Sequence, residues 1–113
     1  MHFSIPLLAL SATSILAQQP VARAGTFVTW DCNECGRTQN CLKHEYQSVD
    51  ANVCAPLVTP NPASITSYYL KDGCTLQLHG DSACADAGPS FPADQFCKPI
   101  EFQYNNYYKI TCV

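Results

Sequence analysis

The chain has 113 residues, eight of them cysteine, and a formal net charge of −3 that is scattered along its length. Because no run of basic residues is present, the charge pattern argues against nucleic acid or an anionic membrane as a partner. A chain this short buries only a marginal core, and an even number of cysteines then predicts a domain cross-linked by four disulfides. The cysteines expected to form them are Cys32, Cys35, Cys41, Cys54, Cys74, Cys84, Cys97 and Cys112.

Residues 1–17 are interpreted as a secretory signal peptide, because they contain an uncharged apolar run that is too short to span a bilayer as a helix. Cleavage after Ala17 is favoured, and a cut after Ala24 is the alternative because small residues also precede that bond. Residues 18–25 are then expected to be a flexible tail, and residues 26–113 a single disulfide-stapled domain. The protein is accordingly predicted to be secreted and extracellular.

The first half of the domain is expected to contain a strand followed by a helix. Residues 26–30 are rich in β-branched and aromatic side chains, which favours a strand. Residues 38–50 are predicted to form a helix, because they carry an apolar stripe at helical spacing. That stripe consists of Leu42, Tyr46 and Val49. Residues 53–58 are apolar but contain Pro56, so they are expected to form at most an edge segment.

Two β-hairpins are expected in the second half. Residues 64–70 and 74–79 are β-rich runs separated by a short turn containing Asp-Gly, and residues 100–104 and 107–113 are separated by Asn-Asn. Alternation along the strand 74–79 places His79 on its polar face. The opposite, core-facing side of that strand is expected to carry Cys74, Leu76 and Leu78.

The stretch 80–99 between the two hairpins is the least regular part of the chain. Asp81 or Ser82 is expected to cap one short helical turn there, and Cys84 and Cys97 would pin the loop at two points. Taken together, the elements predict an α+β fold. It would consist of an antiparallel sheet of four or five strands with the helix packed on one side.

The cysteines in Cys32-Asn33-Glu34-Cys35 form a C-x-x-C motif, a spacing that redox enzymes, metal sites and disulfide corners all use. A catalytic dithiol needs an electropositive setting that stabilises the thiolate, whereas Asp31 and Glu34 would raise the thiol pKa values. The motif is therefore interpreted as structural. Cys32 and Cys35 are predicted to bond different partners across a tight turn.

Cys41 and His44 extend the motif to three thiols and one imidazole, a ligand set suited to tetrahedral zinc. Using three cysteines for a metal would leave five, an odd number, in an oxidising compartment. No metal and no cofactor are therefore expected. Cys41 is instead expected to join the predicted helix to the layer beneath it.

His44 and His79 are the histidines of the predicted mature chain, with Glu45 and Arg37 available beside them in composition. These residues could supply the acid, base and cation of a small ribonuclease-like hydrolase. No nuclease motif surrounds either histidine, so a non-enzymatic protein is favoured and the hydrolase is kept as an alternative.

Tyrosines are concentrated in the β-rich runs, and an exposed group of them would offer broad contact area at low entropic cost. The candidate contact residues are Tyr104, Tyr107 and Tyr68. The competing interpretation is that aromatic residues simply favour strands and cross-strand pairs.

GCTLQLHGDSAC (73–84) and YYKITCV (107–113) together resemble the small secreted cysteine-rich proteins of filamentous fungi. This broad group includes candidate effectors of plant-associated species and killer-toxin-like antimicrobial proteins. The resemblance covers residues 64–113 and consists mainly of cysteines and strand residues. It implies either the α/β sandwich of the killer-toxin-like branch or, as the alternative fold, an all-β crystallin-like sandwich.

The leading functional hypothesis is a non-catalytic, effector-like protein that binds a host or extracellular protein or glycan. The alternative is an antimicrobial, killer-toxin-like protein that acts on competing microbes. The small nuclease is a third candidate. The protein is expected to be a monomer that binds neither nucleic acid nor membranes.

Overall fold

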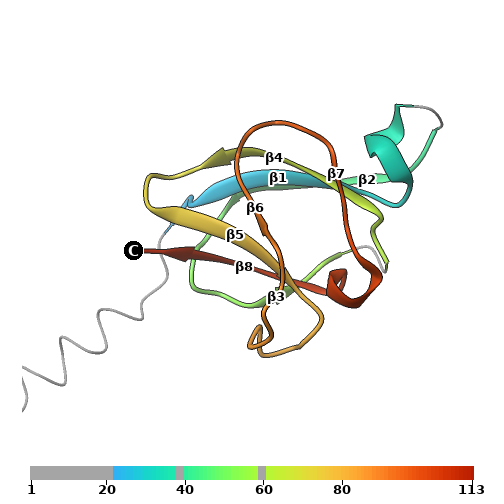
Figure 1. Cartoon of the computed structure of the whole chain (residues 1–113). Coiled ribbons are helices and arrows are strands. Elements are labelled where there is room, and N and C mark those ends of the chain that lie inside the picture. Colours follow the sequence, from blue (N-terminus) through green and yellow to red (C-terminus); the bar gives the residue numbers. More distant parts are fainter. Residues whose placement is uncertain (1–21, 38–39, 59–60) are drawn as a thin grey trace, which may run out of the picture.

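Two four-stranded antiparallel sheets lie one on the other in the computed structural model, which describes residues 22–37, 40–58 and 61–113 (Figure 1). The first sheet has the strand order β2 (Lys43–Val49), β1 (Gly25–Trp30), β4 (Ser64–Leu70) and β7 (Lys98–Pro99). The second has the order β3 (Ala55–Pro56), β8 (Tyr107–Cys112), β5 (Cys74–His79) and β6 (Ser90–Phe91). Two 3-10 turns, η1 (Asn33–Gly36) and η2 (Phe102–Tyr104), complete the described elements.

The core lies between the sheets and draws on both of them. Phe27 of β1 stacks on Tyr46 of β2 with ring centroids 4.4 Å apart, and the edge of Tyr108 meets Phe27 at 5.1 Å. The second sheet contributes the fully buried side chains Leu76, Leu78 and Ile110. The predicted core face of β5 is therefore confirmed, with Cys74 packed against the same cluster.

The small, disulfide-rich domain of antiparallel β-sheet is confirmed, but the predicted helix over residues 38–50 is wrong, and with it the α+β fold class. Lys43–Val49 is a strand that pairs with β1, and residues 38 and 39 lie outside the described residues. The supposed stripe is not buried as a unit, because Tyr46 is buried while Leu42 is 65% exposed. The physical reason is that β1 offers a partner edge on which Tyr46 stacks against Phe27, and this long-range contact decides the structure.

The predicted hairpin of residues 64–70 and 74–79 has the right strands and the wrong pairing. β4 pairs with β1 and β7, while β5 pairs with β6 and β8, so the turn between them is a corner between sheets. Gly73, at φ +79°, supplies the left-handed residue of this corner, and the N–H of Cys74 donates to the carbonyl of Lys71 at 3.0 Å.

The second predicted hairpin is also absent. Residues 100–104 include η2 instead of a strand, and β8 pairs with β5 along its whole length. The edge segment expected over residues 53–58 is confirmed in the short β3, which pairs with the start of β8.

The fold begins slightly before the predicted domain boundary. Gly25, at the end of the expected flexible tail, begins β1, and Ala24 just before it is fully buried, with its N–H donating to the carbonyl of Val49 at 2.8 Å. A cut after Ala24 would therefore remove a core residue. The predicted signal peptide, residues 1–17, lies outside the described residues.

All eight cysteines are paired, as predicted, and the pairs connect distant parts of the chain. The four disulfides are Cys32–Cys41, Cys35–Cys97, Cys54–Cys84 and Cys74–Cys112. The prediction that Cys32 and Cys35 bond different partners is confirmed. Four disulfides in a chain of this size indicate an oxidising environment.

Candidate functional site

The C-x-x-C motif forms a corner that folds over the outer face of the first sheet. Glu34 and Cys35 adopt left-handed conformations, with φ of 62° and 53°, which reverse the chain within η1. The Ser64 hydroxyl donates to the carbonyl of Cys32 at 2.6 Å and accepts the N–H of Cys35 at 3.0 Å. Two disulfides leave the corner, so its sulfurs serve as cross-links.

A metal-like grouping at this corner does not offer a metal site in the oxidised protein. Ligand atoms of Asp31, Cys32 and Cys41 lie within 4.8 Å of one another. The two sulfurs are bonded to each other, however, and therefore provide no thiolates. Cys41 does not join a helix to the layer beneath, as the sequence suggested, but closes a short loop back to Cys32.

Replacing Ser64 with alanine should lower the free energy of unfolding by about 1–3 kcal/mol, because the buried Cys32 carbonyl and Cys35 N–H would both lose their partner. Urea denaturation measures this change. Ser67→Ala is the matched control on the same strand: the Ser67 hydroxyl is buried and has no hydrogen-bond partner among the described residues. A similar loss in both variants would contradict the role assigned to the Ser64 hydroxyl.

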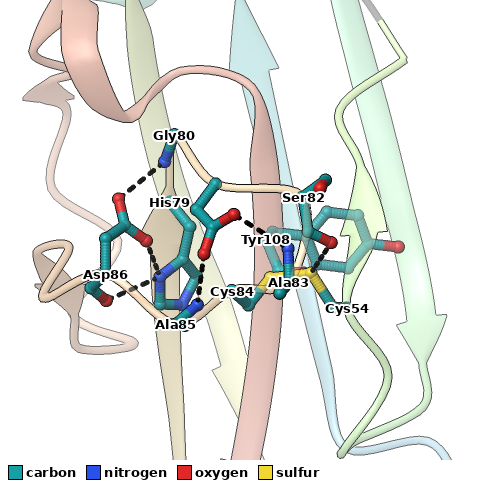
Figure 2. The surroundings of a disulfide bond; sticks show 10 residues. Cys54, His79, Gly80, Ser82, Ala83, Cys84, Ala85, Asp86 and Tyr108 are labelled. Atoms are coloured by element: carbon teal, nitrogen blue, oxygen red, sulfur yellow. Dashed lines mark hydrogen bonds and ion pairs between the residues drawn. A yellow bond between two sulfur atoms is a disulfide. The ribbon is translucent and has the colours of Figure 1, made fainter.

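His79 is buried under the loop that follows β5, contrary to the predicted exposed position. Its side chain is 3% exposed, and its Nδ1 lies 2.7 Å from Oδ1 of Asp86, whose Oδ2 accepts the N–H of Gly80 at 2.9 Å (Figure 2). Asp81 accepts the N–H groups of Ala83 and Ala85, which folds the loop back, but the short helical turn predicted there is absent: the segment consists of turns and bends.

The Cys54–Cys84 disulfide then ties this loop to the segment before β3 (Figure 2). A histidine held by a carboxylate resembles part of a hydrolase site, but a catalytic imidazole must reach its substrate. His79 is covered, and His44 lies on β2 in the other sheet. The side chain of Glu45 points to the opposite face of β2 from His44, so the predicted acid–base group is not assembled.

Asp86 gives the loop a pH dependence. The Gly80 N–H and the His79 ring hold the pKa of Asp86 below its ordinary value. Because the folded pKa is depressed, the stabilisation is present above the ordinary aspartate pKa near 4 and is lost as pH falls through the lower folded value.

We therefore expect Asp86→Asn to flatten the fall in melting temperature between about pH 5 and pH 2. Thermal unfolding followed by circular dichroism at a series of pH values tests this. Asp72→Asn, at an exposed turn, is the control. If the melting temperature of Asp86→Asn falls toward low pH as steeply as that of the wild type, the Asp86 carboxylate does not couple to folding.

The three predicted contact tyrosines do not form one surface. Tyr68 lies on β4 of the first sheet and Tyr107 on β8 of the second, while Tyr104 packs against the core. The reason is the missing final hairpin, which would have brought Tyr104 and Tyr107 together on one exposed ribbon.

Exposed aromatic residues lie instead on β4 and on the loop that precedes β7. Along β4, Ser67 pairs with Phe27 and Tyr69 pairs with Thr26, so Tyr68 is the extra residue of a β-bulge. The side chains of Tyr68 and Tyr69 both reach solvent. The 92–97 loop passes beside β4, where the N–H of Gln95 donates to the carbonyl of Ser67 at 3.0 Å, and it carries the exposed Phe96 (Figure 1).

A cleft of about 390 Å³ separates the corner between β4 and β5 from the start of the 92–97 loop. One wall is the corner itself, residues 70–75, and the other is residues 90–93. Tyr69 directly precedes the first wall, and Phe96 follows the second by three residues. We call the cleft together with Tyr68, Tyr69 and Phe96 the aromatic surface.

The sequence signals only part of this surface. The Asp-Gly turn marks the corner, and Tyr68 is among the contact residues predicted from the tyrosine-rich strands. Tyr69, Phe96 and the second wall were missed, because the stretch 90–97 has no regular pattern that would place it beside β4.

Comparisons with protein-family models, with curated proteins and with solved structures found no match to this chain. Among the helical segments of the described residues, none is long and apolar enough to cross a membrane.

Proposed function

We propose that this is a secreted, non-catalytic binding protein that recognises an extracellular protein through the aromatic surface. The observations that carry the proposal are the exposure of Tyr68, Tyr69 and Phe96, at 41%, 51% and 69%, and the presence of a cleft whose two walls adjoin these residues along the chain. Aromatic side chains are enriched in protein interfaces, where tyrosine and tryptophan are prominent among the residues that dominate binding energy.

The backbone that carries these residues is already held in place, so little of it would need to become ordered on binding. This favours tight recognition. The 92–97 loop is fixed at Gln95 by β4 and at Cys97 by the disulfide to Cys35. An ion pair between Asp94 and Lys98 closes the same loop. Pre-ordering of this kind reduces the entropic cost of association.

The lining of the cleft favours a protein partner over a polyanion. Its walls carry the apolar side chains Leu70, Phe91, Pro92 and Ala93, with Lys71 and Asp72 as neighbouring charges of opposite sign. An apolar anchor on the partner would enter the cleft while the aromatic residues cover its rim. Together with the resemblance to fungal secreted proteins, this supports an effector-like role toward a host extracellular protein.

The experiment compares retention of plant apoplastic proteins by the immobilised wild type and by Tyr69→Ser/Phe96→Ser. The double variant should retain at least about tenfold less of the partner than the wild type does. The reason is that each aromatic contact of this kind contributes more than about 1 kcal/mol to binding. Phe102→Ser is the matched control, because Phe102 is an exposed aromatic residue on η2, outside the aromatic surface.

Equal retention by the double variant would refute the assignment of the aromatic surface. Retention abolished by glycosidase but not by protease treatment of the fluid would indicate a glycan instead. Growth inhibition of fungi or bacteria by the protein, or RNA cleavage that His79→Ala abolishes, would favour the antimicrobial or the hydrolase alternative.

A further inference from the structure

β2 is an edge strand with one side of its main chain unpaired among the described residues. The carbonyl of Leu42 accepts the N–H of Asp31 at 3.1 Å, which shows that Leu42 directs its main-chain groups toward β1. Main-chain direction alternates along an antiparallel strand, so Lys43 and Glu45 turn their N–H and C=O groups outward. A row of outward-facing groups of this kind is a template for another strand.

The side chains along this edge are complementary to themselves in one register. Lys43 and Glu45 are both exposed and, two residues apart, lie on the same face of β2. If a second copy pairs antiparallel about a two-fold axis at His44, each Lys43 lies opposite the other copy's Glu45. Shifting the axis by one residue in either direction places Lys43 opposite Lys43 or Glu45 opposite Glu45, which is repulsive.

The same register also covers apolar surface that is otherwise exposed. It sets Leu42, which is 65% exposed, opposite Tyr46 of the second copy. Val58, 68% exposed, lies beside that tyrosine in each copy, because its N–H donates to the Tyr46 hydroxyl at 2.8 Å. Leu42 and Val58 would therefore come together twice across the two-fold axis.

We propose that two copies of this protein associate through β2, joining their first sheets into one continuous sheet. The dimer is symmetric, with the same patch on both copies, and replaces the monomer expected from the sequence. Ser48, at φ +51°, forms a bulge that ends the regular edge, so the pairing is confined to residues 41–47. An interface this short belongs to the weak class.

Sedimentation equilibrium of the oxidised wild-type protein between about 10 μM and about 1 mM covers the range of such weak complexes. A reversible dimer is expected. Lys43→Glu and Glu45→Lys each create two like-charge contacts across the axis and should raise the dissociation constant roughly tenfold. Lys71→Glu, an equal charge change at an exposed site outside β2, should leave dimerisation unchanged.

The decisive experiment mixes the two single variants and measures whether they form heterodimers. Lys43→Glu offers two negative side chains and Glu45→Lys two positive ones, so a heterodimer of the variants restores both opposite-charge contacts. Heterodimers at wild-type affinity would support pairing through the charged residues of β2, and weakened dimerisation of each single variant would support this register. A wild type that stays monomeric at about 1 mM, or dimers that ignore both charge changes, would overturn the proposal.

Discussion

Removal of the Cys35–Cys97 disulfide, by Cys35→Ser/Cys97→Ser, is expected to lower the free energy of unfolding by about 4 kcal/mol. This bond closes the longest of the four loops, with a sequence separation of 62 against 9 for Cys32–Cys41. A cross-link restricts the unfolded chain more when its loop is longer. The corresponding loss for Cys32→Ser/Cys41→Ser is therefore about 3 kcal/mol.

The folded state adds to this difference. Cys35 holds η1 against the outer face of the first sheet, and its sulfur lies 3.3 Å from the Thr66 hydroxyl. Thr66 and its neighbour across the ladder, Val28, are both buried on that face. Urea denaturation of the two double variants tests the order of the losses. An equal or larger loss in the short-loop variant would contradict it.

Strand positions could be read from the sequence because they depend on local residue types. β4 and β5 have the predicted bounds, and β1 begins one residue early. Their pairing could not be read, because it depends on contacts between distant segments. Leu76 lies opposite Ile110, for example, and this pairing commits β5 to the second sheet instead of to its sequence neighbour β4.

The false helix over residues 38–50 has the same origin. The spacing of Leu42, Tyr46 and Val49 fits a helix, but a short apolar pattern is also compatible with a strand. Tyr46 gains its stacking partner only when Phe27, nineteen positions earlier, is placed beside it. A periodicity within one window contains no information about that contact.

The structural role of Cys32 and Cys35 was predictable from the even number of cysteines. An even number favours disulfide cross-links, whichever cysteines pair with each other. The environment of His79 was not predictable, because the residues that cover it come from the irregular loop after β5. Asp86 and the Cys54–Cys84 bond fold that loop back over the strand. Alternation along β5 describes only the strand and says nothing of what lies on it.

The irregular stretch nevertheless contains glycines that no other residue could replace without moving the backbone, and Gly88 makes the closest approach. A Cβ added to Gly88 would overlap the carbonyl oxygen of Leu78, a main-chain atom of β5 that cannot rotate away. Around this contact the N–H of Leu78 donates to the carbonyl of Pro89 at 3.1 Å, and the side-chain amide of Gln77 donates to that of Gly88 at 2.7 Å. Both bonds hold β6 against β5.

Gly88→Ala must therefore move the chain away from β5, break these bonds and withdraw the buried Phe91 that follows. We expect a loss of about 3 kcal/mol in the free energy of unfolding, at the upper end of the usual cost of overpacking. Ala87→Ser, one position earlier and exposed, should change it by less than about 0.5 kcal/mol. Urea denaturation measures both, and a Gly88→Ala protein as stable as the wild type would show that β6 does not need this close approach.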